Sequence, residues 1–254
     1  MLLAERQQKL VKLVNDKKSV RVSELSEMFS VSEETIRRDL EKLEYDKKLI
    51  RSHGGAIHLT PDDDSIEIPF SERETMNVEE KQEIALKAVE YVKEGDKIIL
   101  DASTTACYMA KVLPDIAITV LTNSVKVAMV LAKKERVTVI STGGILLSNS
   151  LSYVGLLAES AMDTYHVDKA FVSCKGLHLE RGLTDSDEQQ ARIKKKMIEN
   201  AGTVYIMIDC SKIGVRSFSK FSDLDVIDYL ITDSNIDGTL VQQINDRGLD
   251  VIKV

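Results

Sequence analysis

The apolar positions at the start of the chain repeat every three or four residues, in three short blocks. The blocks are Leu3, Leu10, Leu13 and Val14; Leu25, Met28 and Phe29; and Ile36, Leu40 and Leu43. This spacing puts the apolar side chains of each block on one side of a helix, so it predicts three helices around a small core. Two extended stretches follow around Gly54 and Gly55, and a glycine pair can supply the positive φ angles of a tight hairpin turn.

Beyond Lys81 the pattern alternates between short runs rich in Val and Ile and longer helix-like segments. The runs are IIL at 98–100, then ITVLTN, VTVIST, AFVSC, TVYIMID and YLITD. This alternation predicts an α/β domain with a mainly parallel sheet that helices cover on both faces. Residues 59–80 contain two of the three prolines and an acidic cluster without a sustained period, which is typical of a linker. We therefore predict a small domain over 1–58, a linker over 59–80 and a larger domain over 81–254.

Charge divides along the same boundary. The chain of 254 residues has a net charge of -7, which on average opposes binding to the phosphates of nucleic acids. Residues 1–58, however, hold 12 Lys or Arg against 10 Asp or Glu, a net charge of +2, and the remainder holds 22 against 31, a net charge of -9. The opposite signs predict that the two domains have different partners.

Cysteine usage and hydropathy exclude several classes of protein. Cys107, Cys174 and Cys210 are odd in number and widely spaced, so neither a disulfide framework nor a CxxC metal site is expected, and a reducing cytoplasm fits. The sequence has no apolar run of membrane-spanning length, and its first residues form an amphipathic pattern rather than an export signal. It also lacks a dinucleotide fingerprint, a GxxxxGK[ST] loop and an HExxH motif, so we predict no cofactor and no metal.

The third predicted helix carries the side chains that reading DNA requires. Its apolar stripe leaves the opposite side to short polar groups near the start and to cations along the flank. Arginine can form two hydrogen bonds with guanine, and arginine and lysine neutralise phosphates, so this side suits a major groove. The expected DNA-contacting residues of the helix and hairpin are Ser32, Glu34, Thr35, Arg37, Arg38, Lys42, Lys48, Arg51, His53, Gly54 and Gly55. The alternative is a small folded module, or a winged domain that contacts protein.

The segment SEETIRRDLEKLEYDKKLIRSHGGA resembles the signature of the DeoR family of bacterial transcription regulators. The resemblance covers the whole winged segment, including Ser32, residues 35–40 and the Gly-Gly pair. It implies a winged helix-turn-helix whose third helix reads an operator. Asp39 within this pattern is acidic, so it is expected to orient an arginine or the helix rather than to contact a phosphate.

Polar residues and glycines also gather where the predicted strands end. The first strand runs into Asp101 and a Ser-Thr-Thr segment that opens a helix, where free amides and the helix dipole favour an anion such as phosphate. Parallel strands end at one edge of a sheet, so the segments after the other strands should line the same crevice. The expected effector-binding residues are Asp101, Ser103, Thr104, Thr105, Thr122, Asn123, Ser124, Gly143, Gly144, Lys175, Gly176, Glu188, Asp209, Ser211 and Lys212. Taken singly, each is also an ordinary helix cap or strand-end residue.

The larger domain is similar to the DeoR effector domain as far as the carboxyl terminus, and through it to the ribose-phosphate-isomerase-like fold. The resemblance implies a sugar-phosphate effector. It identifies residues 103–105 with the phosphate loop of the family, residues 122–124 and 143–144 with the second and third loops, and Asp209, Ser211 and Lys212 with an Asp-x-Ser-Lys motif. This chain has Ala102 and Ser103 where the family often has a glycine before two threonines.

An enzyme is the rival interpretation of this domain. The isomerases of this resemblance move protons with an Asp-Gly-Ala-Asp-Glu segment, and the corresponding residues 173–176 here are Ser-Cys-Lys-Gly, without a carboxylate. Asp185, Asp187 and Glu188 follow, and they either contact sugar hydroxyls or cap the next helix. In that helix, lysines 194–196 are expected to form a solvated face, with a contact to an effector phosphate as the alternative. We therefore expect binding without turnover and no catalytic residues.

These patterns together predict a cytoplasmic transcription regulator, in the first instance a repressor of a sugar operon that a phosphorylated sugar releases from its operator. One winged domain has a small reading surface, so a dimer or tetramer that grips half-sites about 10 bp apart, or a multiple of that, is expected. The alternatives are a sugar-phosphate isomerase or transferase with an attached winged helix, and a purely structural adaptor.

Overall fold

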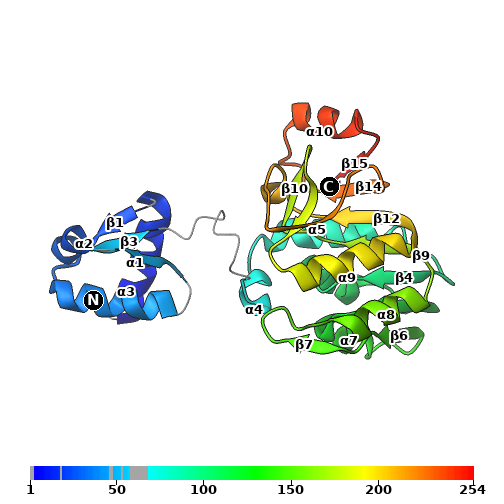
Figure 1. Cartoon of the computed structure of the whole chain (residues 1–254), viewed down its shortest axis with the longest axis horizontal. Coiled ribbons are helices and arrows are strands. Elements are labelled where there is room, and N and C mark those ends of the chain that lie inside the picture. The colour runs from blue at the N-terminus through cyan, green and yellow to red at the C-terminus, as the bar shows by residue number, and fades with distance from the viewer. Residues whose placement is uncertain (1–2, 18, 46–47, 53, 58–67) are drawn as a thin grey trace. The chain divides into compact units, whose positions relative to one another are not determined.

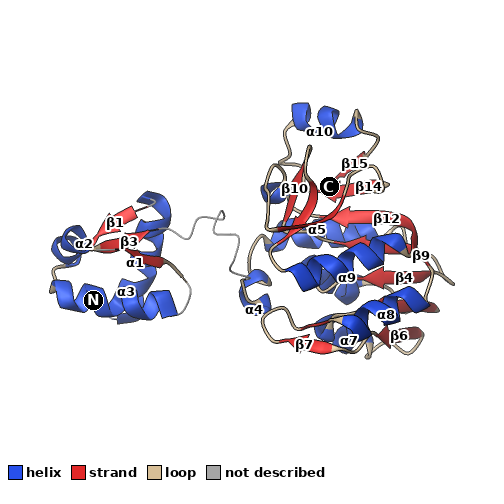
Figure 2. Cartoon of the chain, viewed as in Figure 1, coloured by secondary structure: helices blue, strands red, loops and turns tan. Residues whose placement is uncertain are grey.

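The computed structural model describes residues 3–17, 19–45, 48–52, 54–57 and 68–254. The chain forms two compact units, Met1–Asp63 and Asp64–Val254. Figure 1 colours each unit along the chain and labels many of its helices and strands, and Figure 2 colours them by type. None of the described helices is both long enough and apolar enough to span a bilayer.

The described residues of the smaller unit form three helices and a three-stranded sheet. Its elements are α1 (Leu3–Lys17), β1 (Ser19–Arg21), α2 (Val22–Phe29), α3 (Glu33–Tyr45), β2 (Ile50–Ser52) and β3 (Gly55–Ile57). The apolar blocks of the three helices meet in one core, in which Leu10, Leu25, Ile36 and Leu40 are buried. The predicted helices and hairpin are therefore present. Strand β1 was not predicted; it pairs with β3, which gives the sheet order β1-β3-β2.

The two glycines of the hairpin have different roles. Gly54 has a φ of 88°, in the left-handed region that glycine adopts without steric cost. Gly55 lies in β3, and a Cβ built on it would be 2.1 Å from the carbonyl oxygen of Val20. The expected turn conformation thus applies to Gly54 alone, whereas Gly55 is needed because β1 passes so close.

The larger unit is an α/β domain, as predicted. Its helices are α4 (Phe70–Arg73), α5 (Val78–Val89), α6 (Thr104–Val112), α7 (Val125–Leu131), α8 (Leu156–Thr164), α9 (Glu188–Glu199), the 3-10 helix η1 (Cys210–Lys212) and α10 (Gly238–Asn245). Its strands are β4 (Lys97–Leu100), β5 (Ile118–Thr122), β6 (Val137–Ser141), β7 (Ile145–Leu147), β8 (Ser152–Val154), β9 (Val167–Val172), β10 (Gly176–His178), β11 (Gly182–Asp185), β12 (Ala201–Met207), β13 (Ser219–Ser222), β14 (Tyr229–Thr232) and β15 (Asp250–Lys253).

Seven of these strands form one parallel sheet in the order β15-β14-β12-β9-β4-β5-β6. Successive residues of a strand point to opposite faces. Ile98 and Leu100 of β4 accordingly belong to a core with α5, α6 and α7, whereas Ile99 belongs to a second core with α8 and α9. Helices cover both faces of the sheet (Figure 2). Two antiparallel additions, β10-β11-β13 and β7-β8, extend from it.

The larger unit begins before the end of the expected linker. Helix α4 and the first residues of α5 fall within 59–80, and Phe70 is buried in the core that α5 and α6 share. The Phe70 amide also donates to the carbonyl of Asn149 over 2.7 Å. An aromatic ring inside an acidic, proline-containing stretch thus anchors residues 68–80 to the domain, while residues 58–67 lie outside the described part of the chain.

Candidate functional site

The outer side of α3 presents two arginines, each paired with a glutamate one turn earlier. Arg37 lies 2.6 Å from Glu33 and Arg38 lies 3.3 Å from Glu34. These are exposed i,i+4 pairs, and the Arg38 side chain is 77% exposed. Such pairs contribute little to stability, so the guanidinium groups are available to a nucleic acid. Lys42 is exposed on the same helix, whereas Glu33 was not among the predicted residues.

The start of α3 is fixed by two of the predicted hydroxyl residues. The amide of Thr35 donates to Ser32 Oγ over 3.2 Å, and the two side-chain hydroxyls are 2.8 Å apart. Ser32 therefore serves as a helix cap in the free protein. Lys48 is exposed beyond the end of α3, and Arg51 lies in β2. His53 is outside the described residues.

Asp39 joins α3 to α1. Its Oδ2 lies 2.5 Å from Arg6 Nε, and its Oδ1 accepts a 3.4 Å hydrogen bond from Gln7. The Asp39 side chain is only 4% exposed. Asp39 thus orients an arginine, as its acidity suggested, and that arginine belongs to the first helix.

The sheet topology brings the predicted effector loops together. These loops follow β4, β5, β6, β9 and β12, which are immediate neighbours in the order β12-β9-β4-β5-β6. Because all five strands are parallel, the loops lie along one edge. The strand order reverses between β4 and β9, since β5 and β6 extend from one side of β4 and β9 and β12 from the other. Open α/β sheets bind ligands at such a reversal.

Two helices begin at this edge with serine caps. Ser103 Oγ accepts from the amide of Ala106 over 3.0 Å at the start of α6, and Ser124 Oγ accepts from the amide of Val127 over 3.2 Å at the start of α7. The capped α6 still directs the amides of its first residues, beginning with Thr104, out of the helix. The helix dipole adds partial positive charge there, which favours an anion.

Several buried polar atoms at the same edge have no partner among the described residues. They are Thr105 Oγ1 after β4, Asn123 Oδ1 after β5, Thr142 Oγ1 after β6 and Asp209 Oδ2 after β12. A buried polar atom without a hydrogen bond costs about 1–3 kcal/mol. These four atoms lie at the ends of four of the five strands β12-β9-β4-β5-β6, and a polar ligand at this edge would give them partners; this observation is independent of the helix starts.

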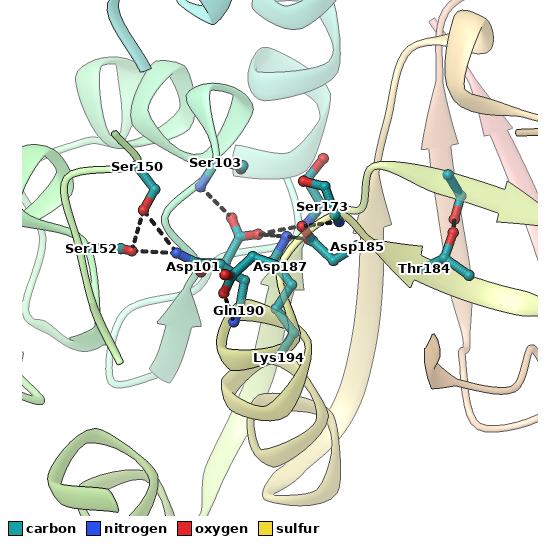
Figure 3. Close-up of polar contacts among 12 residues, drawn as sticks. Asp101, Ser103, Ser150, Ser152, Ser173, Thr184, Asp185, Asp187, Gln190 and Lys194 are labelled. Atoms are coloured by element: carbon teal, nitrogen blue, oxygen red, sulfur yellow. Dashed lines mark hydrogen bonds and ion pairs between the residues drawn. The ribbon is translucent and has the colours of Figure 1, made fainter. Parts of the chain in front are cut away.

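Asp101 holds the loops together through hydrogen bonds that Figure 3 shows as dashed lines. Its side chain is fully buried; Oδ1 accepts from the amide of Ser103 over 3.1 Å and Oδ2 from the amide of Ser173 over 2.9 Å. Lys194 Nζ is 3.6 Å from the same Oδ2. Because protein donors occupy both oxygens, Asp101 positions the ends of β4 and β9 instead of offering a carboxylate to an effector as expected.

The three acids before α9 have three different environments. Asp187 caps α9, since its Oδ1 accepts from the amide of Gln190 over 2.8 Å. Asp185 is buried and forms a 2.6 Å ion pair with Lys194. Glu188 is exposed on the first turn of the helix. Of the two roles open to these acids, capping therefore applies to Asp187, and Asp185 is committed to an internal pair.

Lys194 corrects the expectation of a solvated lysine run. Burial lowers the pKa of Lys194, but the charges of Asp185 and Asp101 outweigh it and raise the pKa above its ordinary value. The reason is helical geometry: Lys194 follows Ala191 by three residues and precedes Met197 by three, so it lies on the buried side of α9. Lys195, the next residue, is exposed as expected.

The end of β12 carries the predicted Asp-x-Ser-Lys segment. Lys212 Nζ donates to Ser173 Oγ over 3.2 Å, which joins this segment to the end of β9. Asp209 Oδ1 accepts from Asn77 Nδ2 over 3.0 Å and also from the hydroxyl of Ser211. Asn77 stands just before α5 with a φ of 48°, and nothing in the sequence singled it out.

Lys81 is a second residue at this edge that the sequence did not identify. It is 4% exposed and donates to the backbone carbonyls of Arg73 and Met76. Burial and the charge of Lys212, only partly offset by Asp209, lower the pKa of Lys81 to about 8. A buried ammonium group whose charge is disfavoured next to a second cation would be stabilised by a bound anion.

Of the predicted glycines at this edge, Gly144 and Gly176 allow close approaches of the backbone, and Lys175 next to Gly176 contributes its amide to backbone pairing. Gly144 has a φ of 115°, and a Cβ there would be 2.7 Å from the carbonyl oxygen of Val154. Gly176 would place a Cβ 2.5 Å from the carbonyl oxygen of Val215. The Lys175 amide pairs with the backbone of β11. Gly143 has a φ of 61°, and a Cβ built on it would meet nothing within 4 Å, so it is the one of these glycines that leaves room for a ligand.

Family models match both units. The model described as "DeoR-like helix-turn-helix domain" matches residues 6–62, and the one described as "DeoR C terminal sensor domain" matches residues 76–234. The chain belongs to the DeoR family of transcriptional regulators. This DeoR-family regulator thus has a DNA-binding helix-turn-helix and a sensor domain, which confirms the resemblance of residues 32–55.

Three relatives illustrate the family. An uncharacterized HTH-type transcriptional regulator, YulB of Bacillus subtilis (strain 168), is 56% identical over 254 residues, covering 100% of this chain and 98% of the relative. The HTH-type transcriptional repressor GlcR of the same organism is 35% identical over 233 residues, 92% of this chain and 89% of GlcR. The L-fucose operon activator of Escherichia coli (strain K12) is 35% identical over 230 residues, 91% of this chain and 95% of the activator.

Among solved structures, the sensor domain of this DeoR-family regulator is similar to ribose 5-phosphate isomerase A of Methanocaldococcus jannaschii. The TM-score is 0.41 and the identity 20%, over 54% of this chain and 55% of the isomerase.

Proposed function

We propose that this DeoR-family regulator represses a sugar operon and leaves its operator when a phosphorylated sugar binds at the carboxyl edge of the seven-stranded sheet. The single observation that carries the effector part is the group of buried, unpaired atoms of Thr105, Asn123, Thr142 and Asp209 after four of the five strands that end at this edge. Hydroxyl, amide and carboxylate atoms of this kind are suited to sugar hydroxyls.

The phosphate is assigned to the start of α6. There the amides following Ser103 face outward, and Lys81 and Lys212 lie near the end of β12 in the same row of loops. Free amides fix the geometry of a phosphate and the two lysines neutralise its charge. Thr104, Ser124 and Gly143 complete the proposed binding set, and Asp101 holds the loops from behind.

DNA binding is assigned to α3 and the hairpin. Arg37 and Arg38 supply contacts to guanine edges or phosphates, while Ser32, Thr35, Lys42, Lys48 and Arg51 fix the register on the backbone. The net charge of +2 on residues 1–58 supports this division of labour. The operator half-sites, about 10 bp or a multiple of that apart, would be read by a homo-oligomer in the cytoplasm.

Binding without turnover is favoured over isomerisation. The segment that carries the acids of the isomerases is Ser-Cys-Lys-Gly at residues 173–176, and the carboxylates of Asp101 and Asp185 are bound internally. Asp209 is then left as a carboxylate that accepts from a sugar hydroxyl, without a second acid assigned to move a proton. Burial raises the pKa of Cys174 to about 12, so that thiol stays protonated and unreactive. The effector then acts by favouring a conformation in which the winged domains are wrongly spaced, to an extent set by its differential affinity for the two states.

The sign of regulation has a second candidate, because one relative is named as an activator. A gel shift on the DNA upstream of this gene, repeated with a panel of phosphorylated sugars, tests the repressor. We expect one sugar phosphate to release the DNA, and the corresponding free sugar to leave the complex intact. Tighter binding in the presence of the effector would support the activator. A coupled assay that detected isomerised sugar phosphate would overturn binding without turnover.

Arg37→Ala with Arg38→Ala and the single change Lys212→Ala separate the two sites. The arginine variant should lose the gel shift while still binding the effector in calorimetry. Lys212→Ala should bind DNA normally and respond only at higher effector concentration. Reversed phenotypes would refute the assignment of the two sites.

A further inference from the structure

Four large apolar side chains are exposed beside the effector edge. Ile145 and Leu146 in β7 are 60% and 51% exposed, and Leu156 and Leu157 at the start of α8 are 75% and 73% exposed. A Cβ built on Gly155 would be 3.2 Å from Cδ1 of Ile145, so β7 and the start of α8 are adjacent. We refer to Ile145, Leu146, Leu156 and Leu157 as the hairpin face.

The hairpin face lies in a stretch without charge. Between Val137 and Ala158 the sequence contains no Asp, Glu, Lys or Arg, although charged residues make up 30% of the chain. The larger unit, Asp64–Val254, holds 22 Lys or Arg against 29 Asp or Glu, a net charge of -7, so two copies of it repel each other over much of their surfaces. The hairpin face is a region where two identical surfaces can meet without placing like charges together.

Strand β7 also has a free edge. Within residues 68–254, all of which the structure describes, β7 pairs only with β8. Free edges of strands are templates for pairing with another chain, and a two-fold axis places a surface opposite its own copy. The apolar edge of β7 can therefore pair with the same edge of a second copy, and this favours a second copy over an unrelated partner.

The area agrees with a dimer contact. A side chain of this size buries on the order of 100 Å² of apolar surface when it is fully covered. Because the four are between 51% and 75% exposed, together they still offer roughly 250 Å². A standard interface buries about 800 Å² on each partner, with an apolar centre and a polar rim. The hairpin face is large enough to be that centre, and the polar residues around it, such as Ser148 and Asn149, would supply rim.

We propose that the hairpin face is the contact through which two copies of this chain associate. Its position also connects it to the effector edge, since Asn123 Nδ2 donates to the carbonyl of Tyr153 over 3.0 Å and Tyr153 N donates to the carbonyl of Asn123 over 2.7 Å. Tyr153 is the register partner of Leu146. Only strand β8 thus separates Asn123, a proposed effector residue, from Leu146 in the hairpin face. Through this strand, effector binding would change the contact between the two copies and so the spacing of the winged domains; this last step rests on the proposed function.

Sedimentation velocity of the full chain without effector tests the contact. We expect the wild type to sediment as a dimer or a larger assembly, and Leu156→Glu to dissociate at concentrations at least tenfold higher than the wild type does. Leu157→Ser, which adds no charge, should weaken the assembly in the same direction. Because both positions are exposed, each variant should keep the circular dichroism spectrum and thermal transition of the wild type.

Phe218→Glu is the matched control. Phe218 is 73% exposed but directly precedes β13, in the separate β10-β11-β13 sheet, and Figure 1 shows β10 and β7 at opposite ends of the larger unit. It should leave the assembly intact. A monomeric wild type, a Leu156→Glu variant of wild-type mass, or dissociation by Phe218→Glu alone would overturn the proposal. Failure of the wild type to shift operator DNA would instead count against the proposed function, because sedimentation needs neither DNA nor effector.

Discussion

Asp101 at the end of β4 accepts a 2.9 Å hydrogen bond from the backbone amide of Ser173 at the end of β9, across 72 residues of sequence. These are the two strands between which the order of the sheet reverses. A buried carboxylate thus closes the point where two loops would otherwise separate, and Lys194 balances its charge from α9. An effector pocket needs such fixed geometry, because a loop that must first become ordered binds its ligand more weakly.

We expect Asp101→Asn to destabilise the larger unit. An amide in place of the carboxylate presents an NH2 group to one of the two backbone donors and leaves Lys194 with Asp185 alone. Hydrogen bonds to charged groups contribute about 1.5–3 kcal/mol, so the free energy of unfolding should fall by about 2 kcal/mol. Urea unfolding followed by near-ultraviolet circular dichroism measures this change.

Asp223→Asn provides the comparison for Asp101. Asp223 pairs with Lys220 on the surface and its side chain is 67% exposed. Surface pairs contribute little, so this variant should unfold at the wild-type urea concentration. Equal midpoints for Asp101→Asn and the wild type would show that the carboxylate does not hold the loops.

We expect loss of the Arg6–Asp39 pair to weaken DNA binding even though it changes no residue on the DNA-facing side of α3. Asp39→Ala leaves Arg6 buried without its carboxylate, and the loss of one partner of a buried pair is strongly destabilising. The thermal transition of the smaller unit should move to a lower temperature, and operator affinity should weaken at least tenfold. Arg6→Asp combined with Asp39→Arg should recover part of both losses, as a double-mutant cycle would measure. No recovery would mean that the two residues act separately.

Glu33 and Glu34 are predicted to restrain non-specific binding. In the free protein they hold Arg37 and Arg38, and their own charge repels phosphates. Glu33→Gln with Glu34→Gln should raise affinity for random-sequence DNA several-fold and steepen its dependence on salt, since each added phosphate contact increases the slope by about 0.9. Fluorescence anisotropy at several salt concentrations tests this. Glu24→Gln with Glu27→Gln, two exposed positions on α2, removes the same two negative charges and serves as the control for a simple gain in net charge. An identical gain in affinity there would contradict the prediction.

The elements could be predicted from the sequence because their periodicity is local. The helices of the smaller unit follow from apolar spacing, and the edge of the larger sheet follows from parallel strands whose ends carry polar residues. Strand β1 was missed because three residues, Ser19–Arg21, are too few for a period, and they become a strand only through pairing with β3.

The roles of individual charged residues depended on packing between distant segments. Lys81 precedes the buried Ile84 by three residues and Ala85 by four, so it occupies the apolar stripe of α5, and Lys194 does the same in α9. A lysine inside an apolar stripe was a usable signal for both. Nothing local could show that Asp101 meets Ser173, because that contact depends on the order of the strands.

We expect the affinity for the phosphorylated effector to depend on pH through Lys81. Its pKa of about 8 means that the side chain carries a charge at pH 7 and loses it as the pH rises through 8 to 9. A bound phosphate favours the charged form of Lys81 and raises its pKa. The affinity for the phosphate is therefore greatest below the pKa of the free protein and falls above it. The total loss is up to about tenfold for each unit by which binding raises the pKa. The sugar phosphate itself stays dianionic over this range, since its second pKa is near 6.

Calorimetry between pH 7 and pH 9.5 should therefore show weaker binding at high pH for the wild type. Lys81→Arg keeps its charge throughout and should give a flat profile, and Lys81→Met should bind weakly at every pH. A wild-type profile as flat as that of Lys81→Arg would separate Lys81 from the phosphate, and the charge near the end of β12 would then have to come from Lys212.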